Sequence, residues 1–182
     1  MSRSYVNRIT LKIRGGVSEL KVSRKAEAGV ETVSITLPTG EVEDYCVLSG
    51  SCTLGINETK YTFSCAIRFD ASGMPEPIAD TDRHFHLIYP TEDKAFVGYL
   101  VDADFEPVGV DRRQLLKSKR NLSLIISVAR MVSEFAMKDL AKRFSRERWL
   151  AWAEVLDPKG FAEGVRANYL CASRGRCVWL PL

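Results

Sequence analysis

A chain of 182 residues has the length of one domain, and its 46% hydrophobic and 27% charged residues are ordinary for a globular protein. Its apolar runs stop well short of the roughly 20 residues that a membrane span needs, so we expect no membrane partner. The net charge of +3 hides three blocks, because residues 1–25 sum to +6, residues 26–111 to −12 and residues 112–182 to +9. Such sorting favours a polyanionic partner or docking between blocks of opposite sign.

The cysteines and the N-terminal residues indicate a cytosol-like compartment. The cysteine count of five is odd, and the first residues lack the apolar segment of a secretory signal. Reduced thiols and a cytoplasmic protein are therefore expected. Cys171 and Cys177 enclose a short segment in which a local disulfide is geometrically feasible, and the sequence leaves that pairing open.

The first part of the chain predicts strands. In residues 5–14, Ile9, Leu11 and Ile13 alternate with polar positions, so one face of the strand is apolar. The other face carries a basic row, Arg8, Lys12 and Arg14. Further strands are expected at 17–23, 30–37, 41–48, 60–69, 83–89 and 95–101, the last as a central strand buried on both sides.

From about residue 111 the apolar pattern changes to helical spacing. Three helices are expected, each after a capping residue: 121–144 behind Asn121, 146–156 behind Ser145, and 158–171 behind Asp157. Strands followed by helices predict an α+β fold, an N-terminal antiparallel sheet or open barrel (about residues 4–110) covered by a C-terminal helical layer (about 111–173). We expect a single domain over residues 1–182, with any sub-boundary near residue 111 between a β-rich part (1–110) and a helical part (111–182).

Two histidines and two aspartates form the sharpest local group. In an extended chain Asp80, Asp82, His84 and His86 project to one face, which would suit a divalent metal. The alternative is a solvent-facing strand edge after an acidic loop, and we expect no metal there. A metal-dependent enzyme centred on His84 and His86 is the third functional hypothesis.

Other catalytic motifs are missing from the sequence. Gly15-Gly16 is not followed by the Lys-Ser/Thr of a phosphate-binding loop, and Ser49 and Ser51 lack the spacing of a nucleophile elbow. The sequence therefore favours a binding protein over an enzyme and requires no cofactor.

The basic blocks supply the leading hypothesis, a nucleic-acid-binding protein that prefers RNA or a single strand. Lys and Arg rows bind phosphates, and neighbouring aromatic rings stack on unpaired bases. Lys138, Lys142 and Arg146, spaced by four, predict a basic ridge on one helix face. The predicted interface comprises Arg8, Lys12, Arg14, Arg112, Arg113, Lys117, Lys119, Arg120, Lys138, Lys142, Arg143, Arg146, Arg148, Trp149, Trp152, Arg174 and Arg176.

The alternative hypothesis is a protein-interaction module, such as an assembly subunit or inhibitor. Its partner would be an acidic protein surface, and the acidic face of one copy could meet the basic face of another in a homo-oligomer. Salt would weaken both kinds of complex, so the charge pattern alone does not separate them.

Overall fold

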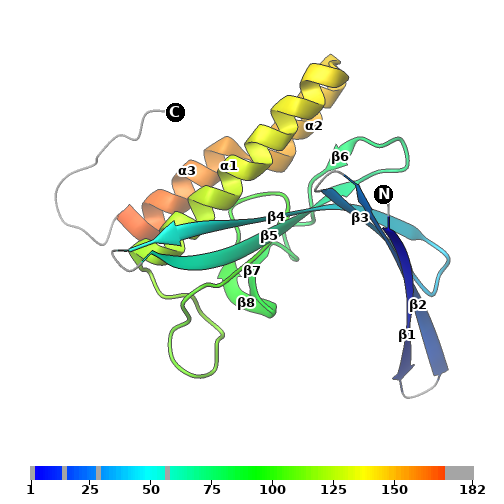
Figure 1. Ribbon diagram of the computed structural model, residues 1–182, viewed down its shortest axis with the longest axis horizontal. Helices are drawn as coiled ribbons and strands as arrows, with labels where there is room; N and C mark the ends of the chain where they lie inside the picture. Colours follow the sequence, from blue (N-terminus) through cyan, green and yellow to red (C-terminus); the bar gives the residue numbers. More distant parts are fainter. Residues whose placement is uncertain (1–2, 14–15, 28–29, 56–57, 171–182) are drawn as a thin grey trace.

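The computed structural model describes residues 3–13, 16–27, 30–55 and 58–170. It has the predicted α+β architecture, with an open, mostly antiparallel sheet followed by helices that cover one of its faces (Figure 1). The strands are β1 (Arg3–Ile13), β2 (Gly16–Glu27), β3 (Val30–Thr36), β4 (Val42–Leu54), β5 (Thr59–Phe69), β6 (Pro75–Glu76), β7 (His84–Leu87), β8 (Tyr89–Lys94) and β9 (Leu100–Ala103).

The strand order is β1-β2-β3-β4-β5-β9-β7-β8, and β6 pairs with β5 beside this path. Neighbours are antiparallel except for β7 and β9. The first five strands form a meander, which is the arrangement that successive alternating segments with short turns favour. In β5 the predicted apolar face is confirmed, because Phe63, Cys65 and Ile67 are buried while Thr62 is exposed.

The predicted central strand at 95–101 is only partly correct. The strand β9 begins at Leu100, although residues 95–99 are largely buried. Gly98 explains this, because its N–H donates to the carbonyl of Val155 at 2.8 Å and its carbonyl accepts from Ile78 at 2.9 Å. These backbone groups therefore bond outside a strand ladder. A Cβ on Gly98 would lie 2.9 Å from Pro77, so this close approach of two chain segments requires glycine.

The helices are α1 (Lys119–Lys142), α2 (Arg146–Leu156) and α3 (Pro158–Val165), followed by the π-helical turn η1 (Arg166–Leu170). Ser145 and Asp157 cap α2 and α3 as predicted. The predicted Asn121 cap is wrong, because Ser118 accepts from the N–H of Asn121 and caps α1. The third helix is also shorter than predicted, since regular α-helix ends at Val165.

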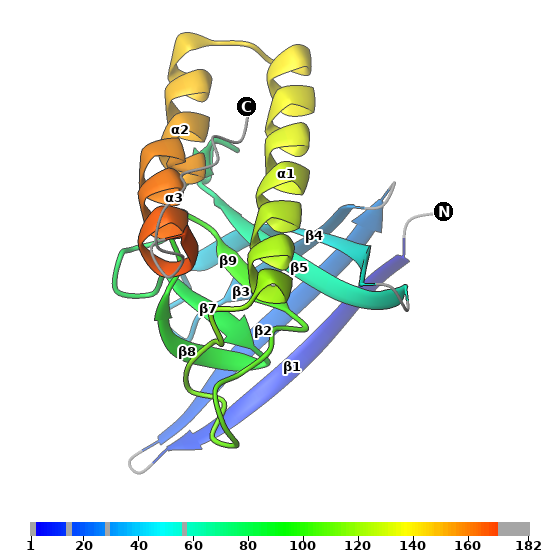
Figure 2. The ribbon, with the colours of Figure 1, turned by 90° about the vertical axis from the view of Figure 1, so that its left-hand side faces the viewer.

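The core lies between the sheet and the helices. Figure 2 shows α1 standing beside α2 and α3 over the middle strands of the sheet. Val128 and Val132 of α1 are fully buried, as are Ile67 of β5 and Val155 of α2. Of the helices that the structure describes, none has the length and apolarity required to cross a membrane.

Candidate nucleic-acid interface

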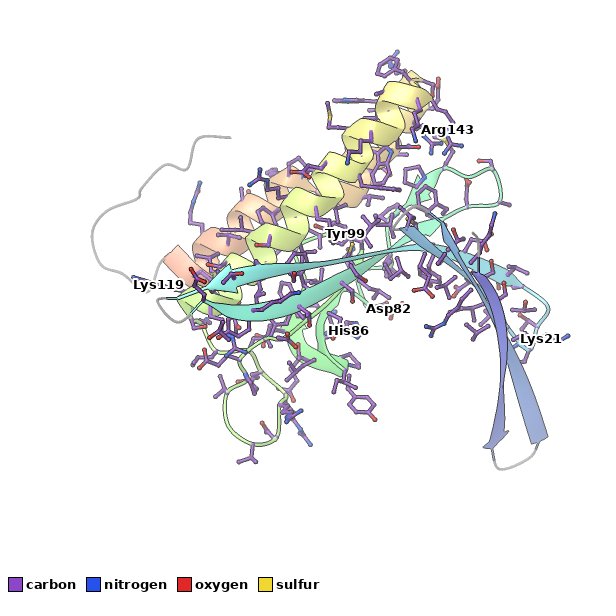
Figure 3. The ribbon with its side chains drawn as sticks, viewed as in Figure 1. Lys21, Asp82, His86, Tyr99, Lys119 and Arg143 are labelled. Atoms are coloured by element: carbon purple, nitrogen blue, oxygen red, sulfur yellow. The ribbon has the colours of Figure 1, made fainter. Side chains whose placement is uncertain are left out.

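The predicted basic residues gather at the two ends of α1. Arg112, Arg113, Lys117, Lys119 and Arg120 lie at or just before its N-terminal end, whereas Lys138, Lys142, Arg143 and Arg146 lie where α1 turns into α2. In Figure 3 the labelled Lys119 and Arg143 mark these two ends. The helix has 24 residues and is about 36 Å long, so the two groups lie at opposite ends of it.

The second group belongs to a helical hairpin that projects beyond the sheet (Figures 1 and 2). We call its end the hairpin tip and define it as Met137, Lys138, Lys142, Arg143, Phe144, Arg146, Trp149 and Leu150. Its apolar members are unusually accessible, with Phe144 74%, Met137 67% and Trp149 52% exposed. Aromatic rings at such exposure gain little by packing, so the tip is a candidate interaction surface.

The cations of the tip are available to a partner. Within the described residues, Lys138, Lys142 and Arg146 form no ion pair, and all three are exposed. Arg143 donates one hydrogen bond to Asp139 at 3.1 Å, yet two thirds of its side chain is exposed. The predicted ridge on one helix is wrong, because α1 ends at Lys142 and Arg146 begins α2. The three cations instead come from two helices on either side of a turn.

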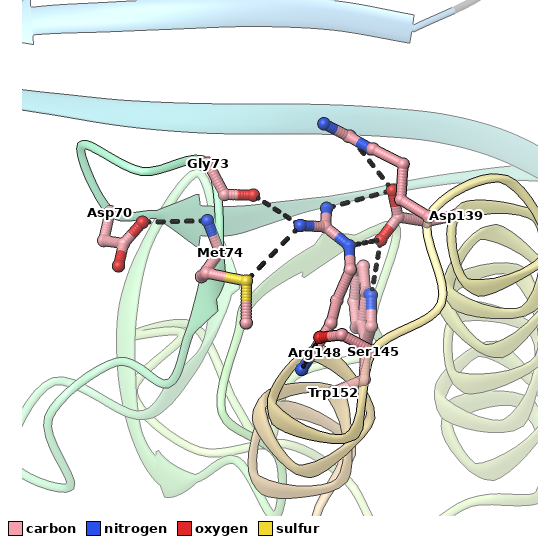
Figure 4. A network of polar contacts seen from close by, with 8 residues as sticks. Asp70, Gly73, Met74, Asp139, Ser145, Arg148 and Trp152 are labelled. Carbon is pink, nitrogen blue, oxygen red and sulfur yellow. Dashed lines mark hydrogen bonds and ion pairs between the residues drawn. The ribbon is translucent and has the colours of Figure 1, made fainter.

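A buried polar network fixes the two helices below the tip (Figure 4). The Asp139 carboxylate accepts two hydrogen bonds from the Arg148 guanidinium, at 2.5 Å from Nε and 3.0 Å from Nη2. It also accepts from Trp152 Nε1 at 2.8 Å. Arg148 Nη1 donates to the carbonyl of Gly73 at 2.9 Å, which joins the hairpin to the loop between β5 and β6. One carboxylate thus connects α1, α2 and, through Arg148, the loop between β5 and β6.

Because of this network, the prediction is wrong for two of the interface residues, Arg148 and Trp152. Trp152 is 1% exposed and Arg148 is 5% exposed. Trp152 also packs edge-to-face against Phe69 and Phe135. Neither side chain has a surface to offer to a nucleic acid, because each is enclosed and already bonded. Trp149, one turn earlier on α2, is the exposed tryptophan.

Asp139 remains ionised in this setting. Burial opposes the charged form, but the hydrogen bonds from Arg148 and Trp152 and the charge of Arg148 outweigh it. Together they hold the pKa of Asp139 below its ordinary value. The network is therefore a charged, fully bonded connection, as buried ion pairs must be to persist.

The first basic group lies among acidic and polar partners. Arg113 is 3.8 Å from Glu92, and Arg120 Nη2 donates to the carbonyl of Asp104 at 2.5 Å. The guanidinium of Arg120 also lies 4.3 Å from the ring centre of Tyr61. This end of α1 therefore presents a less uniform positive surface than the hairpin tip does.

The remaining predicted residues divide into two sets. The register of β1 and β2 places Arg8 opposite Lys21 and Lys12 opposite Val17, so the basic row continues onto Lys21, which is exposed. The side chains of Arg8 and Lys12 lie outside the described part of the structure. So do the whole of Arg14, Arg174 and Arg176, and the cysteine pair 171 and 177.

The histidine group lines an open groove of about 550 Å³. His84, His86, Asp82, Glu92 and Arg113 all border it. Asp80 instead pairs with Arg83 at 2.9 Å. Desolvation lowers the pKa of His86, although the charge of Asp102 opposes this. Across the described ranges, no three His, Cys, Asp or Glu side chains are grouped to hold a metal ion.

Sequence reasoning missed Phe144 and the role of Asp139. The signal for Phe144 was present, because a residue just before the Ser145 cap lies in the turn between two helices.

Comparisons of this chain with protein-family models, with curated proteins and with solved structures find no match.

Proposed function

We propose that this protein binds single-stranded nucleic acid, RNA in preference to duplex DNA, through the hairpin tip and without catalysis. The observation that supports this is that three exposed cations, Lys138, Lys142 and Arg146, form no ion pair among the described residues and belong to the same hairpin tip as the exposed rings of Phe144 and Trp149. The cations suit phosphates, and the rings suit bases that are not already stacked in a duplex. The Asp139 network holds both helices in place, which reduces the entropy lost on binding.

The charge contribution can be tested by fluorescence anisotropy with a labelled single-stranded RNA, titrated at several salt concentrations. Replacing Lys138, Lys142 and Arg146 together by alanine removes three phosphate contacts. Each contact contributes about 0.7 to the salt slope of a single strand, so the slope should fall by about 2. A matched control replaces the exposed Lys60, Lys159 and Arg166, which changes the net charge equally but away from the tip. Equal losses of RNA affinity in the two triple variants would show that the positive charge attracts RNA without a specific binding site.

The stacking contribution requires a separate variant. Trp149→Ala should weaken binding about 5- to 150-fold, the range of one lost base–aromatic stack, whereas Trp149→Phe should keep most of the affinity. Circular dichroism would show that both variants fold. If the wild-type protein does not bind single-stranded RNA at low salt, the proposal fails.

A second candidate function is protein interaction, favoured by a different observation. Ile88 and Tyr89, at the turn between β7 and β8, are 76% and 77% exposed. Asp102 and Asp104, both exposed, share a groove with Ile88 and with Arg112 and Arg120, so this region combines apolar side chains with charges of both signs. In this candidate function its two carboxylates pair with the cations of the hairpin tip of another copy. Size-exclusion chromatography without nucleic acid would then show oligomers that dissociate as salt is raised.

A further inference from the structure

A second groove lies at the opposite end of α1 from the hairpin tip. We call it the polar groove; its volume is about 560 Å³, within the usual range of small-molecule sites. Its lining residues include Ser49 of β4 and Thr62 and Ser64 of β5. Two aspartates, Asp102 in β9 and Asp104 just after it, border the groove. So do two arginines, Arg120 at the start of α1 and Arg112 in the loop before it.

The two arginines provide an anion-binding side. Arg120 is fixed by its bond to the carbonyl of Asp104 and by the ring of Tyr61. Its Nε is buried and has no hydrogen-bond partner among the described residues. Buried donors are normally satisfied, so this one shows that Arg120, at the border of the groove, is incompletely bonded. Arg112 is exposed and forms no ion pair in the described part of the chain.

The two aspartates provide an acceptor side. Asp104 Oδ2 accepts from the N–H and hydroxyl of Thr62, at 2.6 and 2.8 Å. Asp102 Oδ1 accepts from the N–H of Ile88 at 3.1 Å. These bonds orient both carboxylates. The other oxygen of each accepts no hydrogen bond from the described residues, so each is open to a ligand hydroxyl.

Backbone strain is concentrated at the rim of this groove. Four non-glycine residues in the described ranges have positive φ, and two of them, Ile88 at 72° and Arg112 at 56°, border the polar groove. A β-branched residue in this region is a genuine outlier, costing about 1–2 kcal/mol. Such strain gathers at ligand-binding sites, where the surrounding structure enforces it.

We propose that the polar groove binds a phosphorylated sugar. The phosphate would lie against Arg112 and Arg120, because guanidinium groups match phosphate oxygens in geometry and charge. The sugar hydroxyls would donate to the free oxygens of Asp102 and Asp104. A free sugar phosphate and the sugar phosphate of a mononucleotide share this chemistry. The site is independent of the hairpin tip, so it does not rest on the proposed function.

Isothermal titration calorimetry on the full-length protein, freed of nucleic acid, tests the proposal. Ribose 5-phosphate, adenosine monophosphate, ribose and inorganic phosphate are titrated separately. We expect at least one of the two phosphorylated sugars to bind, with ribose and inorganic phosphate roughly 10-fold weaker or more. Tighter binding of the nucleotide assigns a mononucleotide, and equal binding assigns the sugar phosphate alone. No binding of either at millimolar concentration, or inorganic phosphate binding as tightly, overturns the proposal.

Variants locate the site. Arg112→Ala should weaken binding roughly 10- to 100-fold, as the loss of a charge-assisted hydrogen bond does, and Asp102→Asn should also weaken it. Arg113→Ala is the matched control, because Arg113 is the adjacent exposed arginine but borders the histidine groove instead. An unchanged affinity in Arg112→Ala, or an equal loss in Arg113→Ala, contradicts the site. RNA binding by the hairpin tip should persist in all three variants, so the two proposals fail separately.

Discussion

Replacing Asp139 by asparagine tests whether the buried network holds the hairpin to the sheet. Asp139 and Arg148 are 8% and 5% exposed, so the change leaves a buried guanidinium without its counter-charge. Removing one partner of a buried pair costs about 3–5 kcal/mol, and asparagine can still accept one of the hydrogen bonds. We therefore expect a loss of about 3 kcal/mol. For a chain of this length that lowers the melting temperature by roughly 6–12 °C.

Urea unfolding followed by tryptophan fluorescence measures this loss, because Trp152 is bonded to Asp139 and reports its surroundings. The control is Glu134→Gln, on the same helix, where an exposed ion pair with Arg130 should contribute little. The double variant with Arg148→Met leaves no unpaired charge, so its cost should be smaller than the sum of the single costs. A single-variant loss below about 0.5 kcal/mol, or strict additivity, would refute the importance of the pair.

The same pair predicts a pH dependence. The folded-state pKa of Asp139 is lowered, so its contribution is present above the unfolded pKa, near 4. This contribution is lost as the pH falls through the folded-state value. The stability difference between wild type and Asp139→Asn should therefore be full at neutral pH and shrink below about pH 4. A difference that stays constant into acid would show that the carboxylate is not ionised in the folded protein.

Three further predictions concern single sites. Asn121→Ala should cost roughly 3 kcal/mol in urea unfolding, because this fully buried amide bonds both backbone groups of Glu106 and the carbonyl of Leu116; a loss near zero would contradict it. Ile88→Asn should raise stability by up to about 1 kcal/mol by relieving the positive φ, and a decrease would argue against strain. Burial raises the pKa of Cys46 and Cys65 to about 12, so peptide mapping after alkylation at pH 8 should find both unlabelled until urea is added.

Alternation and periodicity predict the elements of this fold well, because each strand or helix repeats its own pattern. In the middle of β5 the alternate residues Phe63, Cys65 and Ile67 are buried, as expected. The change from strands to helices, expected near residue 111, falls between β9, which ends at Ala103, and α1, which starts at Lys119. The α1 cap was misplaced because Ser118 and Asn121 are both good caps. The choice between them depends on the bonds of Asn121 to the 106–116 segment, which local sequence does not contain.

The candidate site was less predictable than the fold, since exposure depends on tertiary contacts. Trp149 and Trp152 are three residues apart on α2, and the sequence treats them alike. Asp139, on another helix, accepts the indole N–H of Trp152 and so decides which ring is enclosed. Arg148 resembles its basic neighbours in the sequence, yet the same carboxylate draws it inside.

In the folded molecule the basic and acidic blocks of the sequence are distributed differently at the two ends of α1. Near the N-terminal end of α1, Arg113 approaches Glu92 and Arg120 bonds to Asp104, so basic and acidic blocks meet and partly offset one another. At the other end the hairpin extends past the sheet (Figures 1 and 2), and Lys138, Lys142 and Arg146 form no ion pair with the described residues. The long helix therefore separates a mixed polar groove from a basic, aromatic tip. Because interactions between exposed charges are screened within about 10 Å, the charges at the two ends of this helix, which is about 36 Å long, are electrostatically independent of each other.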